Sequence, residues 1–199
     1  YRWDFPEENL DFLTFHFESF IPPIPDRKEK AEEQMNRMRG AGQSFGAIPA
    51  NFELIESLYT TLIEKLDQHF AQFPYLLGNK PSIGDFGLIA PFFGHLGRDP
   101  VAIRLLQTKA IRQFRWVERM NRPDPDFGEF GPGAEEYLPG DEIPDSLIEV
   151  LKRIAIDFMP ETAAASATIN QWLEENQKMP SNTVAERHVG FTEFDAMGT

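Results

Sequence analysis

Residues 75–89 read Tyr-Leu-Leu-Gly-Asn-Lys-Pro-Ser-Ile-Gly-Asp-Phe-Gly-Leu-Ile. Within this stretch, Ser82 and Asp85 have the S-x-x-D spacing of a capping box. In such a box the serine hydroxyl accepts from the amide of the aspartate, and the aspartate carboxylate accepts from the amide of the serine. Because this pair satisfies amides that a helix start leaves open, it predicts a helix beginning at residue 83. Loss of either side chain should cost about 0.5–2 kcal/mol.

The helix that this box opens is predicted to run over residues 83–96. Its apolar side chains surround the axis and are Ile83, Phe86, Leu88, Ile89, Phe92, Phe93 and Leu96. A helix that is apolar all round must be buried all round. We therefore expect a buried central helix over residues 83–96.

Helical periodicity recurs on both sides of this segment. Residues 52–73 carry apolar side chains at i, i+3, i+4 and i+7, which indicates a helix burying one face, and Pro74 ends it. No stretch alternates as a half-buried strand does. Further helical segments are expected at 12–21, 28–39, 100–106, 111–120, from 145 to an interruption at Pro160, and at 162–176. The fold class predicted is an all-α bundle of six to eight helices around residues 83–96.

The domain organisation expected is one all-α domain over residues 1–199, with its core at about 50–176. Residues 121–144, rich in Pro, Gly and acidic residues, are expected to form a loop, and 177–199 a weakly structured tail. The chain starts at Tyr1 without a cap or a loop. For that reason we expect it to be a fragment of a longer two-domain protein.

Charge and composition exclude several functions. The net charge of −13 repels phosphate backbones, so nucleic-acid binding is not expected. No run reaches the roughly 18 apolar residues of a membrane helix, and a membrane association is not expected. The chain has no cysteine, which rules out disulfides, thiolate metal ligands and a cysteine nucleophile within it. This composition is compatible with a reducing compartment, and we expect a cytoplasmic protein.

Basic and histidine side chains give weaker signals. The most basic stretch lies between Arg104 and Arg122, and its spacing favours a solvated helix face. The histidines lack the H-E-x-x-H spacing of a zinc site, so no metal site is predicted. For two of them, His69 and His95, surface or hydrogen-bonded roles are favoured over metal ligation.

A family resemblance emerges from the order of the motifs. An apolar-stripe helix leads to the turn Tyr75-Leu76-Leu77-Gly78, and a short polar loop leads to the Ser82–Asp85 box. This order resembles the C-terminal α-helical domain of the glutathione S-transferase superfamily, in which such a box caps the central helix. Residues 92–100 and the run Trp116-Val117-Glu118-Arg119-Met120 are also similar to that domain. The resemblance extends from about Phe52 to Met120, and Gly84 stands where the family more usually has Ala.

The resemblance implies a function for the intact protein. In the family, a thioredoxin-like domain binds glutathione and supplies the Tyr, Ser or Cys that stabilises its thiolate, whereas the helical domain lines the pocket of an apolar electrophile. The intact protein is thus expected to conjugate glutathione to such an electrophile, or to reduce it with glutathione, and to form a homodimer. We expect the thioredoxin-like domain to be absent from this chain. The chain would then hold no catalytic residue and bind no cofactor, with glutathione the co-substrate of the intact protein.

The first helices of the family's helical domain line the co-substrate pocket. By this resemblance, an apolar pocket wall is expected from Tyr1, Trp3, Phe12, Phe15 and His16. The alternative is ordinary core packing, since aromatic side chains at helical spacing usually pack. Two other functions remain open for the chain, namely a non-catalytic transferase-like module for protein–protein assembly and a stand-alone binder of a hydrophobic ligand.

Overall fold

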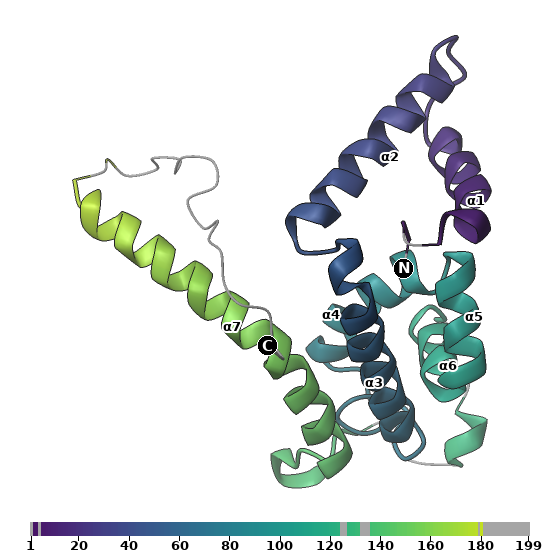
Figure 1. Ribbon diagram of the computed structural model, residues 1–199. Helices are drawn as coiled ribbons and strands as arrows, with labels where there is room; N and C mark the ends of the chain where they lie inside the picture. The colour runs from purple at the N-terminus through teal and green to yellow at the C-terminus, as the bar shows by residue number, and fades with distance from the viewer. Residues whose placement is uncertain (1, 4, 124–126, 132–135, 179, 181–199) are drawn as a thin grey trace. The chain divides into compact units, whose positions relative to one another are not determined.

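The computed structural model describes residues 2–3, 5–123, 127–131, 136–178 and 180 (Figure 1). The described residues form an all-α fold, as the sequence predicts, with isolated bridges at Gly78 but no sheet. Tyr1 and most of the predicted tail at 177–199 lie outside them. The helices are α1 (Pro6–Ser19), α2 (Arg27–Ser44), α3 (Phe52–Phe70), α4 (Ile83–Pro91), α5 (Pro100–Lys109), α6 (Ile111–Met120) and α7 (Asp145–Glu175). Shorter elements are the π-helical turn η2 (Phe92–Leu96) and the 3₁₀ turns η1 (Pro49–Asn51), η3 (Gly128–Phe130) and η4 (Pro139–Asp141).

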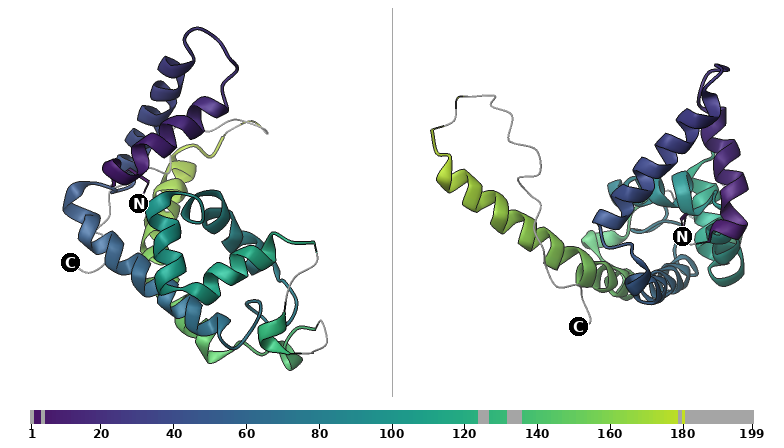
Figure 2. Two further views of the ribbon diagram at one scale, coloured as in Figure 1. Left: turned by 90° about the vertical axis from the view of Figure 1, so that its right-hand side faces the viewer. Right: turned by 45° about the horizontal axis from the view of Figure 1, so that its top comes forward.

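The chain divides into two compact units, Tyr1–Leu147 and Ile148–Thr199. In the first unit, α3, α5 and α6 pack against one another and α4 packs against α6. The helices α1 and α2 form a helical hairpin, which is clear in both views of Figure 2, and α1 also contacts α5. The prediction of a single domain over the whole chain stays a prediction.

The core of the first unit is an aromatic stack between helices. The ring of Trp116 on α6 lies flat against Phe70 of α3, with centroids 5.0 Å apart, and edge-on to Phe92 of η2, at 6.3 Å. All three side chains are buried, as are Ile63 and Leu66 of the α3 stripe. Offset and edge-to-face ring pairs add to the free energy of burial, so this stack holds α3, η2 and α6 together.

The expectation that residues 83–96 form a helix buried all round is wrong. Asp85 and Phe92 are buried, but 91% of Ile83 and 61% of Phe86 are exposed. The α-helix ends at Pro91, which cannot donate to the carbonyl of Gly87, and a π-helical turn follows it. Among the longer helices, α4 packs against α6, which covers one side of α4. Apolar side chains on the other side of α4 therefore face outward in this chain.

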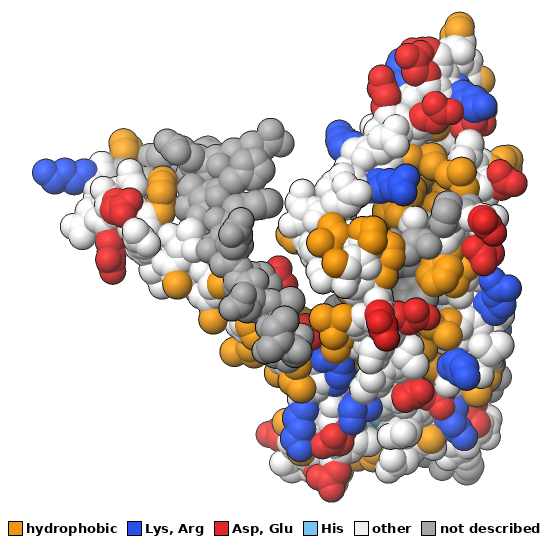
Figure 3. All heavy atoms as spheres, in the orientation of Figure 1, with side chains coloured by type: hydrophobic (Ala, Val, Ile, Leu, Met, Phe, Trp, Pro, Cys, Tyr) orange, Lys and Arg blue, Asp and Glu red, His pale blue; other side chains and the backbone are white. Residues whose placement is uncertain are grey.

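Apolar side chains are also exposed elsewhere in the first unit. Figure 3 shows them between α1 and α2 and around the turn into α3. Among the described residues of the first unit, Phe15, Phe20 and Phe45 are phenylalanines whose side chains are more than two-thirds exposed. Isolated apolar side chains are normal on a protein surface, whereas several together indicate an interaction surface.

The long helix α7 begins in the first unit and continues through the second. The predicted interruption at Pro160 is wrong, because α7 runs through this residue to Glu175. A proline within a helix removes one backbone hydrogen bond, here the one to the carbonyl of Ile156, and the helix can continue when the rest of the turn is satisfied. Within the second unit, Arg153 Nη2 donates to Asp157 Oδ2 at 2.7 Å, one helical turn further on.

Candidate functional site

The carboxylate of Asp85 is the centre of the best-defined polar site. Its Oδ2 accepts from the backbone amide of Ser82 at 2.8 Å and from the Ser82 hydroxyl at 2.7 Å. The Ser82 oxygen accepts in turn from the amide of Asp85 at 3.4 Å, which completes the capping box at the start of α4. The other oxygen, Oδ1, accepts from the amide of Leu76 at 3.1 Å and from Trp116 Nε1 at 3.0 Å.

Asp85 therefore joins two neighbouring segments to a third that is 31 residues away in the sequence. Its side chain connects the start of α4, the turn after α3 and the middle of α6, and it is fully buried. No ion pair to Asp85 occurs among the residues that the structure describes. Four donors and the positive end of the α4 dipole stabilise a carboxylate in this position.

The turn before α4 depends on Gly78. This glycine has φ +116°, and a Cβ atom there would lie 3.0 Å from the backbone nitrogen of Leu138 and 3.1 Å from the carbonyl oxygen of Glu136. The amide of Leu138 donates to the carbonyl of Leu77 at 3.0 Å. A glycine is therefore required both by the left-handed backbone and by the close approach of residues 136–138.

His69, near the end of α3, is a hydrogen-bonded core residue. The expected surface role is wrong, because its side chain is fully buried, and the alternative of a hydrogen-bonded role is confirmed. Its Nδ1 lies 2.9 Å from the hydroxyl of Ser146, and its Nε2 lies 3.3 Å from the carbonyl oxygen of Tyr75. The ring also packs against Phe70 and Phe73. Since a carbonyl oxygen can only accept, the proton belongs on Nε2 and Nδ1 accepts from Ser146.

The pKa of His69 is lowered from its ordinary value. Burial is the main cause, because it disfavours the charged imidazolium; the hydrogen bond to Tyr75 and the negative charge of Asp85 act in the opposite direction. His69 is therefore a neutral side chain that joins the end of α3 to the start of α7, with the proton on one defined nitrogen.

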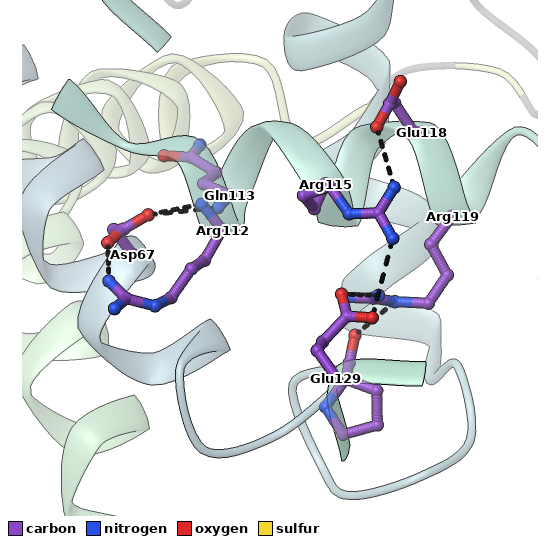
Figure 4. A network of polar contacts seen from close by, with 8 residues as sticks. Asp67, Arg112, Gln113, Arg115, Glu118, Arg119 and Glu129 are labelled. Atoms are coloured by element: carbon purple, nitrogen blue, oxygen red, sulfur yellow. Dashed lines mark hydrogen bonds and ion pairs between the residues drawn. The ribbon is translucent and has the colours of Figure 1, made fainter. Parts of the chain in front are cut away.

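The start of α6 is capped from another helix (Figure 4). Asp67 Oδ1, on α3, accepts from the amides of Arg112 at 2.7 Å and of Gln113 at 3.3 Å, and Asp67 Oδ2 accepts from Arg112 Nη1 at 2.8 Å. The residue preceding α6, Ala110, has no side chain that could cap it. Asp67 thus takes the place of a local N-cap.

A second ionic group lies further along α6, as Figure 4 shows. Glu129 Oε1 accepts from Arg119 Nη1 at 3.0 Å, and Glu129 Oε2 lies 3.5 Å from Arg115 Nη2. Arg119 Nε also donates to the carbonyl of Pro74 at 3.2 Å. Partial burial raises the pKa of Glu129, but its backbone hydrogen bond and the two arginines outweigh this and lower the pKa overall.

The prediction of a solvated basic face over residues 104–122 is wrong at Arg119. Only 3% of this residue is exposed, and its guanidinium lies over the rings of Phe130, Tyr75 and Phe127 at 5.1, 5.8 and 5.9 Å. The acidic partner and two of the rings come from the loop after α6. Helical spacing alone could not show that Arg119 is buried, although Arg119 does share the apolar face of α6 with Trp116.

A pocket with a volume of about 320 Å³ opens beside Arg119. Its lining comes from the loop before α4, from α4, and from the end of α6 with the residues that follow. The lining residues are Tyr75, Asn79, Lys80, Pro81, Phe86, Arg119, Met120, Arg122, Pro123 and Phe127. A further pocket, of about 340 Å³, is lined by Phe70, Ala71, Arg112, Arg115, Glu129 and Phe130.

The expected aromatic pocket wall is brought together only in part. Phe12 stacks on His16, with centroids 5.4 Å apart, and His16 contacts Phe20 edge-on at 4.7 Å. Trp3 packs instead against Phe17, at 6.3 Å. Phe15 is 74% exposed on α1, and Tyr1 lies outside the described residues. A substrate-binding role for this group stays a prediction.

Sequence reasoning missed the residues of the 320 Å³ pocket. The local pattern gives Lys80 and Pro81 no role beyond the loop before the capping box, and it places Arg122 on a solvated helix face. The available signal was the pair of basic-Pro dipeptides at 80–81 and 122–123, each of which adjoins the end of a helix that the sequence predicts. Their proximity depends on the packing of α4 on α6, which a local pattern does not reveal.

Two kinds of feature are absent from the described residues. No group of three or more His, Asp or Glu side chains among them could hold a metal ion. None of the described helices has the length and apolar character needed to cross a membrane. Comparisons with protein-family models, with curated proteins and with solved structures give no match.

Proposed function

We propose that this chain is the helical, co-substrate-side domain of a glutathione S-transferase-like protein. One observation carries the proposal: Trp116 Nε1 donates to Asp85 Oδ1 at 3.0 Å. The two separate sequence motifs on which the resemblance rests, the Ser82–Asp85 box and the run 116–120, meet in this hydrogen bond. A cap that also accepts a hydrogen bond from α6 supports a structural role in placing α4 within such a domain.

The proposed reaction belongs to the intact protein. The glutathione thiolate would attack an apolar electrophile, forming a carbon–sulfur bond while the leaving group departs with its electron pair. The residue that stabilises the thiolate would lie in a thioredoxin-like domain, and the aromatic residues of α1, with Trp3, would contribute to the electrophile's pocket. The intact protein would act as a homodimer in the cytoplasm.

A comparison of two proteins tests this proposal. Residues 1–199 and the full gene product, including whatever is encoded before Tyr1, are titrated with glutathione by calorimetry and assayed with glutathione and 1-chloro-2,4-dinitrobenzene. We expect glutathione binding and chloride displacement only with the full product. Micromolar glutathione binding by residues 1–199, or no glutathione binding by the full product, would contradict the proposal.

The pocket wall is tested in the same full product. Replacing Trp3 and Phe15 by Ala should weaken binding of the apolar electrophile and leave glutathione affinity unchanged. Unchanged affinity for the electrophile, with an unchanged circular dichroism spectrum, would remove these residues from the site.

A second candidate function is a transferase-like module for protein–protein assembly. The exposed apolar side chains favour it, in particular Ile83 and Phe86 on α4 and Phe45 at the end of α2. The encoded sequence before Tyr1 distinguishes the two functions. A strand–helix–strand pattern with an apolar-Pro step followed by Glu-Ser or Asp-Ser favours the transferase, whereas a tRNA-binding or synthetase-like segment favours the assembly module.

A further inference from the structure

The long helix α7 carries its apolar side chains along one stripe. They recur at alternating steps of three and four residues, at positions 148, 151, 155, 158, 162, 165, 169 and 172, where Thr162 is the one polar residue. This is the heptad period with which one α-helix packs along another. We call these positions, with the adjacent Met159 and Leu173, the α7 stripe. Its period predicts that a second helix packs along it.

The large side chains of the α7 stripe are exposed. Leu151, Phe158 and Ile169 are each at least 40% exposed, and so are Met159 and Leu173 beside them. Apolar side chains that are exposed together along one face indicate an interaction surface. The stripe therefore has the composition of an interface.

The opposite face of α7 is polar. At 100° per residue it carries Arg153 and Asp157, whose side chains are hydrogen-bonded to each other, and also Pro160. The backbone hydrogen bond that a proline removes is thus lost away from the stripe. Figure 1 shows that α7 continues through this residue as one helix, so the stripe is not interrupted there.

The α7 stripe is self-complementary about its middle. Its centre, residues 162–167, reads Thr-Ala-Ala-Ala-Ser-Ala, and large side chains lie on both sides of it. If two copies pair antiparallel about this centre, Ala155 lies opposite Trp172 of the second copy, and Phe158 lies opposite its Ile169. A small residue then meets the largest one, as interdigitating side chains require. Both copies use the same surface, as a two-fold dimer requires.

The charges of α7 favour the antiparallel orientation. Its basic residues, Lys152 and Arg153, lie in the first half and offset acidic residues there. The second half carries only acidic charges, at Glu161, Glu174 and Glu175. A parallel pair would bring these acidic ends together, whereas an antiparallel pair separates them and also opposes the two helix dipoles.

We propose that residues 1–199 form a two-fold dimer in which the α7 stripes of two copies pack antiparallel as a coiled coil. From Leu151 to Leu173 the stripe is about 33 Å long. Burying the exposed parts of its side chains in both copies removes an area on the order of 1,000 Å², which is what a stable interface needs. The proposal does not rest on the transferase assignment, because it concerns the self-association of this chain through α7 alone.

Sedimentation velocity of residues 1–199 at micromolar concentrations tests the dimer. Ile169→Glu places a carboxylate in the stripe and should raise the dissociation constant at least about tenfold, because an unpaired charge is costly to bury. Ile156→Glu is the matched control, since Ile156 is also exposed on α7 but lies off the stripe, and it should leave the dissociation constant unchanged. Phe158→Ala, a second change within the stripe, should weaken the dimer as well. Far-ultraviolet circular dichroism checks that the variants are folded.

Labelled cysteines test the orientation, and the chain has no cysteine of its own. A nitroxide is attached at Ala163→Cys or at Gln177→Cys, both exposed positions. Pulsed electron paramagnetic resonance then measures the distance between the two labels of a dimer. In an antiparallel pair we expect about 20 Å at position 163, near the two-fold axis, and more than about 30 Å at position 177. A parallel pair gives similar distances at both positions.

Four results would overturn the proposal. One is that residues 1–199 sediment as a monomer, as they would if the residues after 180 of the same chain covered the stripe. A second is a dimer that Ile169→Glu leaves intact, which would place the interface elsewhere. A third is that Ile156→Glu dissociates the dimer as far as Ile169→Glu does. The fourth is equal label distances at positions 163 and 177.

Discussion

The indole nitrogen of Trp116 lies 3.0 Å from Oδ1 of Asp85, across 31 residues of sequence. Through this contact a local helix cap becomes part of the tertiary structure. The same carboxylate oxygen accepts from the amide of Leu76, so the turn after α3 is fixed by the same group. The start of α4, the turn and α6 thus depend on one hydrogen-bonded side chain in the core.

Two glycines should respond in opposite ways to replacement by alanine. Gly87 lies within α4, and a Cβ atom there would have no neighbour within 4 Å. Gly87→Ala should therefore raise the free energy of unfolding by about 0.5–1 kcal/mol through helix propensity. Gly78→Ala should lower it by more than about 1 kcal/mol, because the residue has a positive φ and approaches the backbone of Leu138. Urea denaturation followed by circular dichroism measures both changes, and equal effects would contradict this account of the turn.

The cap of α6 should depend on Asp67 and not on its ion pair. Asp67→Ala leaves two amides without their acceptor and should cost about 1–2 kcal/mol. Arg112→Ala keeps those amide contacts and removes only a salt bridge whose arginine side chain is 55% exposed, so it should cost less than about 1 kcal/mol. If the same denaturation experiment finds the arginine variant the less stable of the two, the helix is not held by a cap from α3.

His69 should contribute a pH dependence to stability. A histidine in the unfolded chain titrates near 6.5, and burial lowers the pKa of His69 in the folded protein. Between these two values the unfolded chain binds a proton that the folded chain lacks. The free energy of unfolding therefore rises with pH in this window. The stabilising contribution of a neutral His69 is fully present above about pH 6.5 and is lost on acidification.

Urea denaturation between pH 5 and 8 measures this dependence. The variant His69→Gln should be less stable at pH 7.5 but should have a smaller slope between pH 5 and 7. A residual slope is expected from His95, whose pKa is also lowered, chiefly by burial. Phe73→Leu serves as the control, because it disturbs the packing on His69 without removing a titratable group. An unchanged slope in His69→Gln would show that this side chain is not the source.

The parts of the fold that follow from neighbouring residues could be predicted. The Ser82–Asp85 spacing specifies a reciprocal cap whatever surrounds it, and the stripe of α3 specifies which face is buried. In contrast, the all-round apolar character of residues 83–96 suggested complete burial, but Ile83 is 91% exposed. The hydrophobicity of a side chain shows that its burial would stabilise the fold. It does not show that another segment of this chain covers that side chain.

The candidate sites depended on contacts that no local pattern contains. Arg119 is buried because Glu129 and two rings of the following loop surround its guanidinium. The pocket beside it is lined by residues around position 80 and by residues around position 122. These two groups lie close together only because α4 packs on α6. Asp67 caps a helix that starts 44 residues later in the sequence, at Ile111.

The coupling between Asp85 and Trp116 measures how far this carboxylate holds α4 and α6 together. Free energies of unfolding in urea, followed by circular dichroism at 222 nm, are compared for the parent, Asp85→Ala, Trp116→Phe and the double variant. We predict a coupling free energy of about 1–3 kcal/mol between Asp85→Ala and Trp116→Phe, as for a buried hydrogen bond to a charged group. As a control, the destabilisation by Asp85→Ala and that by Asp26→Ala, at the start of α2, should add within about 0.5 kcal/mol. Additive effects of Asp85→Ala and Trp116→Phe would contradict the claim that this carboxylate holds α4 and α6 together.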